Sequence, residues 1–199
     1  MLFRSDQVRP RWVIVENVRG APVEVWSEQL AALGYVTSWA LLDAADWGLP
    51  SHRRRLFVVA GPVGYRWPTP THYGPDVPWL LRGGRQPWVG FGQALGLDDQ
   101  DHYYPFGVTS TFQPDPIDPR RPALCLNTKA NQYVVRTGKM RRLHVWQSAI
   151  LLGFPEGYPF QGSKQAQHRQ IGNAVAPIMA EVLARGLTGD RSEEHTSEL

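Results

Sequence analysis

Apolar residues in the first third of the chain follow strand-like runs and one helix-like spacing. Residues 12–16 form a short apolar run with β-branched side chains, which predicts a buried strand. Residues 22–33 carry apolar side chains at helical spacing and predict a helix. Residues 35–42 and 55–60 predict two more strands, with a loop over 43–50 between them. This order of strand, helix and strand indicates an α/β domain.

The pattern becomes irregular over residues 62–122, which are rich in proline, glycine and tryptophan. One helical turn is expected over 93–97. Aromatic residues are frequent in this segment, whereas disordered segments are poor in them, so we expect a folded, loop-rich insert. Two interpretations stay open, a small irregular subdomain packed on its aromatic rings and a recognition surface.

Regular patterns return near residue 123. Residues 123–126 and 133–136 predict strands around a turn at 129–132. Residues 145–152 predict a short helix, and residues 171–187 predict a longer helix with one apolar face. The second half of the chain therefore returns to the mixed α/β pattern.

Composition narrows the class of protein. The chain of 199 residues has a net charge of +3, carried by 18 arginines against 3 lysines. Arginine suits phosphate and base-edge contacts because its planar fork binds at two points, although a GC-rich genome gives the same bias.

No apolar run is long enough for a membrane span, and the N-terminus lacks the apolar core of a signal peptide. One cysteine excludes an intramolecular disulfide and, with six scattered histidines, gives no convincing metal site.

Three short motifs carry the candidate chemistry. Glu16-Asn17-Val18 follows a predicted strand directly, where α/β folds place ligand-binding residues. Residues 51–55, Ser-His-Arg-Arg-Arg, lead into the apolar strand 55–60, and alternation along a strand puts Arg53 and Arg55 on one face. Taken singly, these motifs also fit an exposed strand-end acid and a solvated basic strand start.

The third motif is Gln170-Ile-Gly-Asn-Ala-Val-Ala-Pro177. Gly172 permits close backbone approach by a ligand. Asn173 is also a good helix N-cap residue, so an ordinary capped helix is the alternative interpretation.

Together and in this order, the three motifs resemble the later motifs of DNA cytosine-5 methyltransferases. The resemblance covers about residues 1–189. It implies an α/β fold, namely a partial Rossmann-like S-adenosylmethionine-dependent methyltransferase domain with a parallel sheet, plus a small irregular target-recognition domain. Residues 1–62 would be the second half of the catalytic domain, 63–140 the target-recognition region, and 141–189 the return to the catalytic domain. Residues 190–199 resemble a translated library adapter and are expected to be a non-native tail.

The resemblance implies roles for individual residues. Glu16 would hydrogen-bond N3 and the exocyclic amine of a flipped cytosine, and Arg55 would contact its O2. Arg53 would take the neighbouring role towards the base and the backbone. Gly172, Asn173, Ala174 and Val175 would form part of the S-adenosyl-L-methionine pocket. Double-stranded DNA is the implied partner, with Arg82, Arg85 and Trp88 as candidate contacts in the recognition region.

Some family features are missing or altered. The family's cysteine nucleophile lies upstream of its Glu-Asn-Val motif, yet no cysteine precedes Glu16, and no glycine-rich cofactor motif is present. Cys125 is interpreted as a buried structural residue in a strand. Ser51 replaces the family's glutamine and Ala176 replaces a proline.

These departures leave three hypotheses. The first is a fragment of a methyltransferase that is inactive alone. The second is a non-catalytic DNA-recognition subunit of a split methyltransferase, which needs a missing N-terminal half or companion subunit. The third is a degenerate DNA-binding relic. In each case we expect a cytoplasmic protein of bacterial or phage origin, associated with the nucleoid and not with a membrane.

Overall fold

The computed structural model describes residues 3–97, 101–104, 115–126, 128, 133–136 and 139–188. The expected tail at 190–199 and the expected turn at 129–132 lie outside the described residues. The chain divides into two compact units. The first comprises Met1–Leu42, Arg54–Thr69 and Ala180–Leu199, and the second comprises Asp43–Arg53 and Pro70–Met179.

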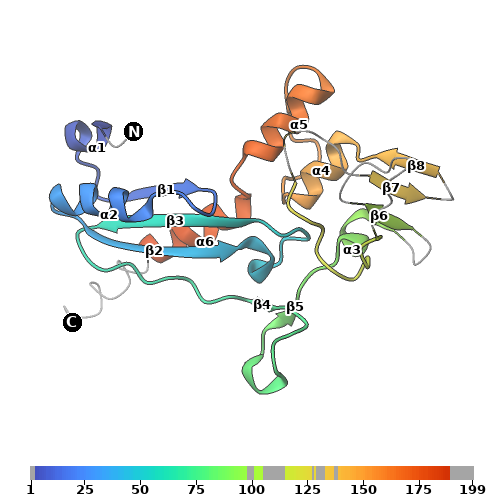
Figure 1. Cartoon of the computed structure of the whole chain (residues 1–199), viewed down its shortest axis with the longest axis horizontal. Coiled ribbons are helices and arrows are strands. Elements are labelled where there is room, and N and C mark those ends of the chain that lie inside the picture. Colours follow the sequence, from blue (N-terminus) through green and yellow to red (C-terminus); the bar gives the residue numbers. More distant parts are fainter. Residues whose placement is uncertain are drawn as a thin grey trace, which may run out of the picture. The chain divides into compact units, whose positions relative to one another are not determined.

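A three-stranded sheet forms the centre of the first unit. Its order is β1 (Val13–Asn17), β3 (Arg54–Gly61), β2 (Val36–Asp43). The middle strand pairs antiparallel with β1, from Val13 opposite Ala60 to Asn17 opposite Leu56. Figure 1 shows β1 and β2 running in the same direction and β3 in the opposite one.

The expectation of a parallel sheet is therefore wrong for the paired strands β1 and β3. The physical reason lies in the connections. Between β1 and β2 lies a helical crossover, which parallel strands require. Between β2 and β3 lie only residues 44–53, too few for such a crossover, so the chain reverses and inserts β3 between the other two strands.

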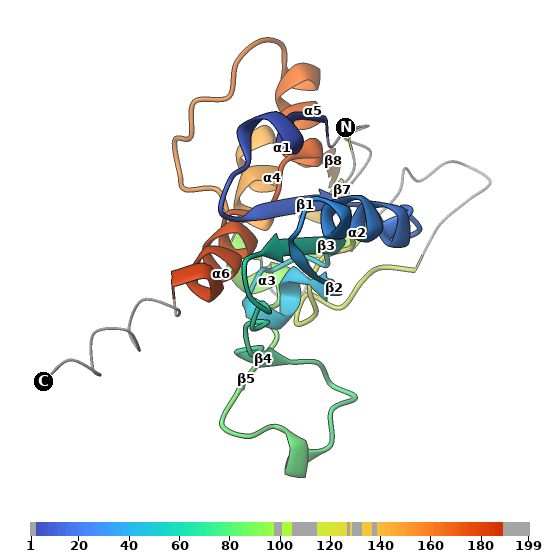
Figure 2. The ribbon, with the colours of Figure 1, turned by 90° about the vertical axis from the view of Figure 1, so that its left-hand side faces the viewer.

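Helix α2 (Val23–Ala32) covers one face of this sheet, as Figures 1 and 2 show. Its buried residues Val23 and Leu30 pack with alternate residues of β3, namely Leu56, Val58 and Ala60. Phe57 and Val59 are buried as well, so β3 is buried along both faces. The strands predicted at 12–16, 35–42 and 55–60 and the helix predicted at 22–33 are thus confirmed to within two residues at each end.

Two further helices belong wholly or partly to this unit. Helix α1 (Phe3–Val8) was not predicted from the sequence. Helix α6 (Pro177–Thr188) is anchored by Tyr65, whose hydroxyl donates to the Leu183 carbonyl oxygen at 2.8 Å. A side chain at Gly186 would collide with this tyrosine ring, since an added Cβ would overlap the Tyr65 hydroxyl oxygen.

The second unit is built from short elements. In chain order they are η1 (Ala44–Trp47), β4 (His72–Tyr73), η2 (Trp79–Leu81), β5 (Gln86–Pro87), α3 (Phe91–Leu95), β6 (His102–Tyr104), β7 (Tyr133–Arg136), β8 (Lys139–Arg142), α4 (Val145–Leu151) and α5 (Lys164–Asn173). Strands β4 and β5 form a small parallel pair, and β6, β7 and β8 form an antiparallel sheet in that order. The described parts of the loop-rich insert, residues 62–97, 101–104 and 115–122, therefore contain folded elements, as the aromatic content of the insert indicated.

Three local predictions differ from the structure. The loop expected at 43–50 contains the 3₁₀ helix η1, and residues 123–126 form no strand beyond one bridge between Ser51 and Ala123. The strand at 133–136 pairs with β6 and β8 instead, because the segment that follows it immediately can close a local hairpin.

The single helix predicted over 171–187 is two helices. Helix α5 ends at Asn173, Ala174 is extended with φ −71° and ψ 151°, and α6 begins at Pro177. Proline disfavours helical geometry in the residue before it and is favoured at a first helical position, so Pro177 explains both the break and the restart.

Among the described residues, no helix is both long enough and apolar enough to cross a membrane.

Candidate active site

Glu16 and Arg55 form an ion pair on adjacent strands of the first unit. The Arg55 Nε lies 3.0 Å from the Glu16 Oε1. Glu16 is opposite Phe57 in the β1–β3 ladder, so Arg55 is its diagonal neighbour on the same face. The side chains are 16% exposed for Arg55 and 25% exposed for Glu16. Partial burial weakens screening by water, which strengthens the attraction between the two charges.

The pair is held in place at the end of the sheet. Arg55 Nη1 also donates to the carbonyl oxygen of Arg54 at 2.9 Å, and the Asn17 side chain accepts from the Val18 backbone N–H at 2.8 Å. The guanidinium is thus fixed by its own strand and by the carboxylate. A carboxylate acceptor beside guanidinium donors is complementary to a flat polar ring that presents both donors and acceptors.

Arg53 contacts the end of helix α5, whereas Arg55 contacts Glu16. It lies directly before β3, is 2% exposed, and its Nη2 donates to the carbonyl oxygens of Gly172, at 3.1 Å, and of Ala174. These carbonyls belong to the C-terminal end of α5, where helix carbonyls lack partners within the helix and the helix dipole favours a cation. Arg53 therefore caps this end of α5 and fixes the loop that follows it.

Residues 172–175 form the end of α5 and the start of that loop. Gly172 is buried and Asn173 is the last helical residue, so the interpretation of Asn173 as a helix N-cap is wrong. The side chain of Asn173 is exposed, and Val175 is 37% exposed. An exposed hydrogen-bonding amide and an exposed apolar side chain are therefore two positions apart in sequence, at the end of α5 and in the segment after it. This combination fits a ligand with polar and apolar parts, as S-adenosylmethionine has.

Asp43 organises the segment that carries Arg53, and none of the three sequence motifs includes it. It is 8% exposed, and its Oδ1 accepts from the backbone N–H groups of Ala45 at 3.3 Å and Arg53 at 2.9 Å. Its Oδ2 lies 2.9 Å from Nδ1 of His52. Asp43 is also the N-cap of η1, and an aspartate between a predicted strand and a loop was the signal that could have revealed it.

Ser51 stands where the family has glutamine. Its side chain is fully buried, and the hydroxyl donates to the carbonyl oxygen of Leu151 in α4 at 2.7 Å. The substitution therefore gives this position a structural hydrogen bond that joins the arginine motif to α4.

Cys125 was expected to be buried in a strand, and this is wrong. Its side chain is exposed, and residues 124–126 lie in irregular backbone. The run of alternating leucines suggested a strand, but the described residues offer Leu124–Leu126 no continuous strand partner.

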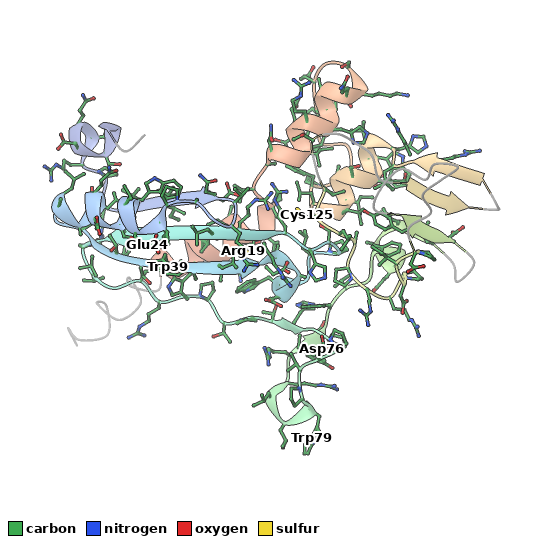
Figure 3. All side chains as sticks on the ribbon, viewed as in Figure 1. Arg19, Glu24, Trp39, Asp76, Trp79 and Cys125 are labelled. Carbon is green, nitrogen blue, oxygen red and sulfur yellow. The ribbon has the colours of Figure 1, made fainter. Side chains whose placement is uncertain are left out.

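The recognition-region candidates take part in local packing. Arg82 donates from Nε to the Val77 carbonyl oxygen at 3.2 Å, and its guanidinium carbon lies 4.7 Å from the centre of the Tyr73 ring. Trp88 donates from Nε1 to Asp46 Oδ1 at 2.9 Å and meets the His52 ring edge-on at 4.9 Å. The neighbouring η2 exposes Trp79 at 73% on a projecting segment, visible in Figure 3.

Solved structures share this arrangement of elements. The chain resembles the Dnmt2 methyltransferase of S. pombe with a TM-score of 0.65 at 15% identity, covering 92% of this chain and 68% of that one. It resembles the Entamoeba histolytica methyltransferase EhMeth with a TM-score of 0.62 at 13% identity, covering 91% of this chain and 63% of that one. The chain therefore has the α/β fold of S-adenosylmethionine-dependent methyltransferases.

Sequence comparison gives the family. The model of the C-5 cytosine-specific DNA methylase family matches residues 5–78 and 87–188, and the chain belongs to this family. It is 27% identical to the Type II methyltransferase M.AplI of Arthrospira platensis over 90% of this chain and 57% of that protein. It is 28% identical to the Type II methyltransferase M.NgoMIV of Neisseria gonorrhoeae over 91% of this chain and 65% of that protein. The chain thus spans a little under two thirds of the length of these relatives, and the resemblance noted in its motifs is confirmed.

Proposed function

We propose that this chain forms the base-holding wall and part of the cofactor wall of a DNA (cytosine-5-)-methyltransferase. The observation that carries the proposal is the partly buried ion pair of Glu16 and Arg55 at 3.0 Å. Its substrate would be a cytosine flipped out of double-stranded DNA, because enzymes that modify a base within a duplex must take it out of the stack.

The pair matches the polar edge of cytosine. Glu16 would accept hydrogen bonds from the exocyclic amine and from a proton on N3, which activates the ring towards attack at C6. Arg55 would donate to O2 and stabilise negative charge that develops on the ring. Since the two side chains already hold each other, little reorganisation is needed when the base enters.

The second wall would be the loop at Gly172, Asn173, Ala174 and Val175. S-adenosyl-L-methionine, when bound, supplies the methyl group. The exposed Asn173 amide would hydrogen-bond it and Val175 would provide an apolar contact, while Arg53 keeps the loop in position through two carbonyl oxygens. These residues fit one side of a cofactor pocket.

We further propose that methyl transfer requires a partner segment with the family's cysteine and glycine-rich motifs. It would be joined upstream or supplied as a companion subunit, and this chain alone would be inactive. Within the described sheet β1 is an edge strand, and an edge offers unpaired backbone groups to an added strand. Residues 63–140 would read the DNA sequence, as the target-recognition region, and the protein would act in the cytoplasm at the nucleoid.

The direct test is reconstitution. The chain is produced together with the segment encoded upstream of it, and transfer of a labelled methyl group from S-adenosylmethionine to duplex DNA is measured. We expect methyl transfer by the two segments together and none by this chain alone. Glu16→Ala should abolish transfer, whereas Glu24→Ala, which removes an exposed carboxylate from α2 (Figure 3), should not.

Two outcomes would contradict the proposal. One is equal transfer by the Glu16→Ala and Glu24→Ala proteins. The other is transfer to adenine instead of to C5 of cytosine, which mass spectrometry of the digested DNA would reveal. If the two segments form a complex that binds DNA but transfers no methyl group, the alternative of a non-catalytic recognition subunit is favoured.

A further inference from the structure

A hollow of about 720 Å³ in the second unit is lined by basic side chains from three elements. Arg142 comes from the end of β8, His144 precedes α4, and Lys164 and His168 belong to α5. No carboxylate lines it among the described residues. We call it the α4–α5 hollow, and its charge favours an anionic ligand.

An aromatic surface lies on the rim of this hollow. Trp146 lines it and is 54% exposed, and its ring stacks on that of His144 with an interplanar angle of 10° and 6.4 Å between centroids. A flat, exposed, pre-oriented indole is a suitable surface for stacking a nucleic-acid base, which needs no particular sequence.

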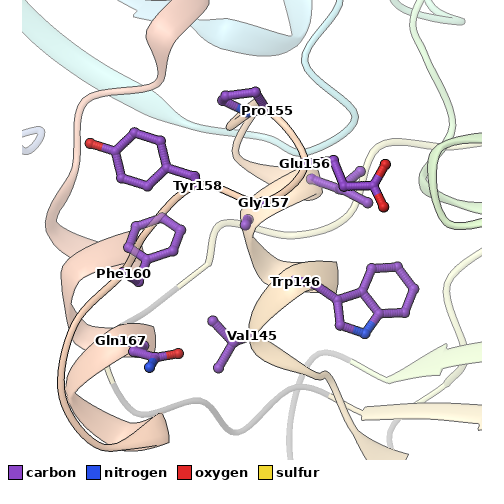
Figure 4. Close-up of a pocket in the computed structure, with 10 residues that line it drawn as sticks. Val145, Trp146, Pro155, Glu156, Gly157, Tyr158, Phe160 and Gln167 are labelled. Atoms are coloured by element: carbon purple, nitrogen blue, oxygen red, sulfur yellow. The ribbon is translucent and has the colours of Figure 1, made fainter.

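A second, less polar pocket of about 310 Å³ adjoins the first, and Trp146 and Gln167 line both. Figure 4 shows Tyr158 and Phe160 on one side of it and Trp146 and Glu156 on the other. The rings of Tyr158 and Phe160 are packed with centroids 4.7 Å apart, which makes this wall firm. The pocket, which we call the aromatic pocket, offers ring faces together with a carboxylate and an amide.

The positive charge in the hollow affects its own histidine. The pKa of His168 is lowered, first by burial and then by the positive charges of Arg142 and His144. Lys164 on the same helix adds a further cation to the hollow. A bound phosphate would offset this repulsion.

We propose that the α4–α5 hollow and the aromatic pocket together bind a single-stranded segment of DNA, with phosphate in the hollow and an unstacked base against Trp146. A basic groove beside aromatic rings is the recurrent design for single strands. In a duplex the bases are stacked on each other and could not reach the indole. The choice of DNA over RNA rests on the proposed function, whereas the site itself uses neither Glu16 nor Arg55.

The test uses the whole 199-residue chain and a short, labelled oligodeoxythymidine, with binding followed by fluorescence anisotropy. Trp146→Ala should weaken binding by about fivefold or more, the effect of losing one stacked base. Trp39→Ala is the matched control, because Trp39 is 52% exposed but lies on β2 of the first unit (Figure 3), and it should bind as the parent does.

Salt dependence tests the phosphate contacts. Removing one cation from a single-strand site should lower the slope of log affinity against log salt by about 0.7. We expect this for Arg142→Gln and for Lys164→Gln, the second being an exposed position that the fold does not need. Arg185→Gln, an exposed site on α6, should leave the slope unchanged. The oligonucleotide should also raise the pKa of His168, measured from its imidazole signals by NMR.

Equal affinities of the Trp146→Ala and Trp39→Ala proteins for the single strand would overturn the proposal. So would a loss of affinity for the duplex form on Trp146→Ala as large as the loss for the single strand. If the site binds an RNA oligonucleotide in preference to DNA, the proposal as stated is overturned. These measurements use no cofactor and no cysteine-bearing segment. Failure of methyl transfer in the reconstituted enzyme is therefore distinguishable from failure of this site.

Discussion

The buried guanidinium of Arg53 donates to the carbonyl oxygen of Gly172 at 3.1 Å and so joins two motifs that are 119 residues apart in sequence. One motif leads into strand β3, and the other ends helix α5. The same Nη2 reaches the Ala174 carbonyl oxygen. The proposed cofactor loop therefore depends on an arginine to which the resemblance gives a role towards the base and the backbone.

Arg53→Lys should destabilise the protein although it keeps the charge. An ammonium is a point charge on a differently shaped stem and cannot reproduce the guanidinium fork, so at least one buried carbonyl loses its partner. We expect a loss of about 2 kcal/mol in the free energy of unfolding, measured by urea denaturation. Arg54→Lys, an exposed neighbour, should change it by less than about 0.5 kcal/mol. Equal effects of the two changes would show that the carbonyl contacts are unimportant.

Glu16→Gln should reduce the rate of methyl transfer far more than it weakens DNA binding. The amide keeps the shape but has no proton that it can transfer to N3 and no negative charge to stabilise the protonated ring, and that interaction is strongest in the transition state. In the reconstituted enzyme we expect kcat to fall by about 100-fold or more, the usual scale of a lost acid–base group. The DNA dissociation constant should stay within about threefold. Parallel losses in both quantities would argue for a binding role alone.

Ser51→Ala should lower stability through the Leu151 carbonyl. The hydroxyl of Ser51 is fully buried and bonds that oxygen at 2.7 Å, so its removal leaves a buried acceptor without this donor. The expected cost is about 1–2 kcal/mol. Ser27→Ala is the matched control, since the buried Ser27 hydroxyl has no hydrogen-bond partner among the described residues and its loss should be neutral or stabilising. Urea denaturation followed by circular dichroism compares the two.

Tyr65 should make stability fall at high pH. Burial raises the pKa of Tyr65 to about 12, so the folded protein holds this proton more tightly than the unfolded chain does. A raised folded pKa gives stability that is complete below the unfolded value near 10 and is lost as the pH rises towards 12. Tyr65→Phe lacks the bond to Leu183 but also lacks this loss.

The stability difference between the parent and the Tyr65→Phe protein should therefore shrink as the pH rises. Urea denaturation at about pH 8 and about pH 11 measures it on either side of the unfolded pKa. A difference that stays constant across this range would show that the Tyr65 hydroxyl is not protected by burial.

Local patterns were sufficient for the three strands and for helix α2 of the first unit, and insufficient for helix α1 and for parts of the second unit. The apolar alternation in β3 and the helical spacing in α2 each depend on residues a few positions apart, so both elements were predicted. Helix α5 is strongly polar, with only Ile171 and Gly172 buried, and gave no apolar stripe to detect. The break before Pro177 was missed because, in side-chain polarity alone, the apolar periodicity of α6 continues backwards to residue 171.

The sequence by itself determined the family, the order of its motifs and the residue types available for chemistry, because these depend only on which residues follow one another along the chain. The tertiary structure decided which of these residues contact one another. Strand register made Glu16 and Arg55 diagonal neighbours, and the end of α5 placed unsatisfied carbonyl oxygens where Arg53 could reach them. Such contacts join residues far apart in sequence, and they form because buried charges and carbonyl groups must find partners when water is excluded.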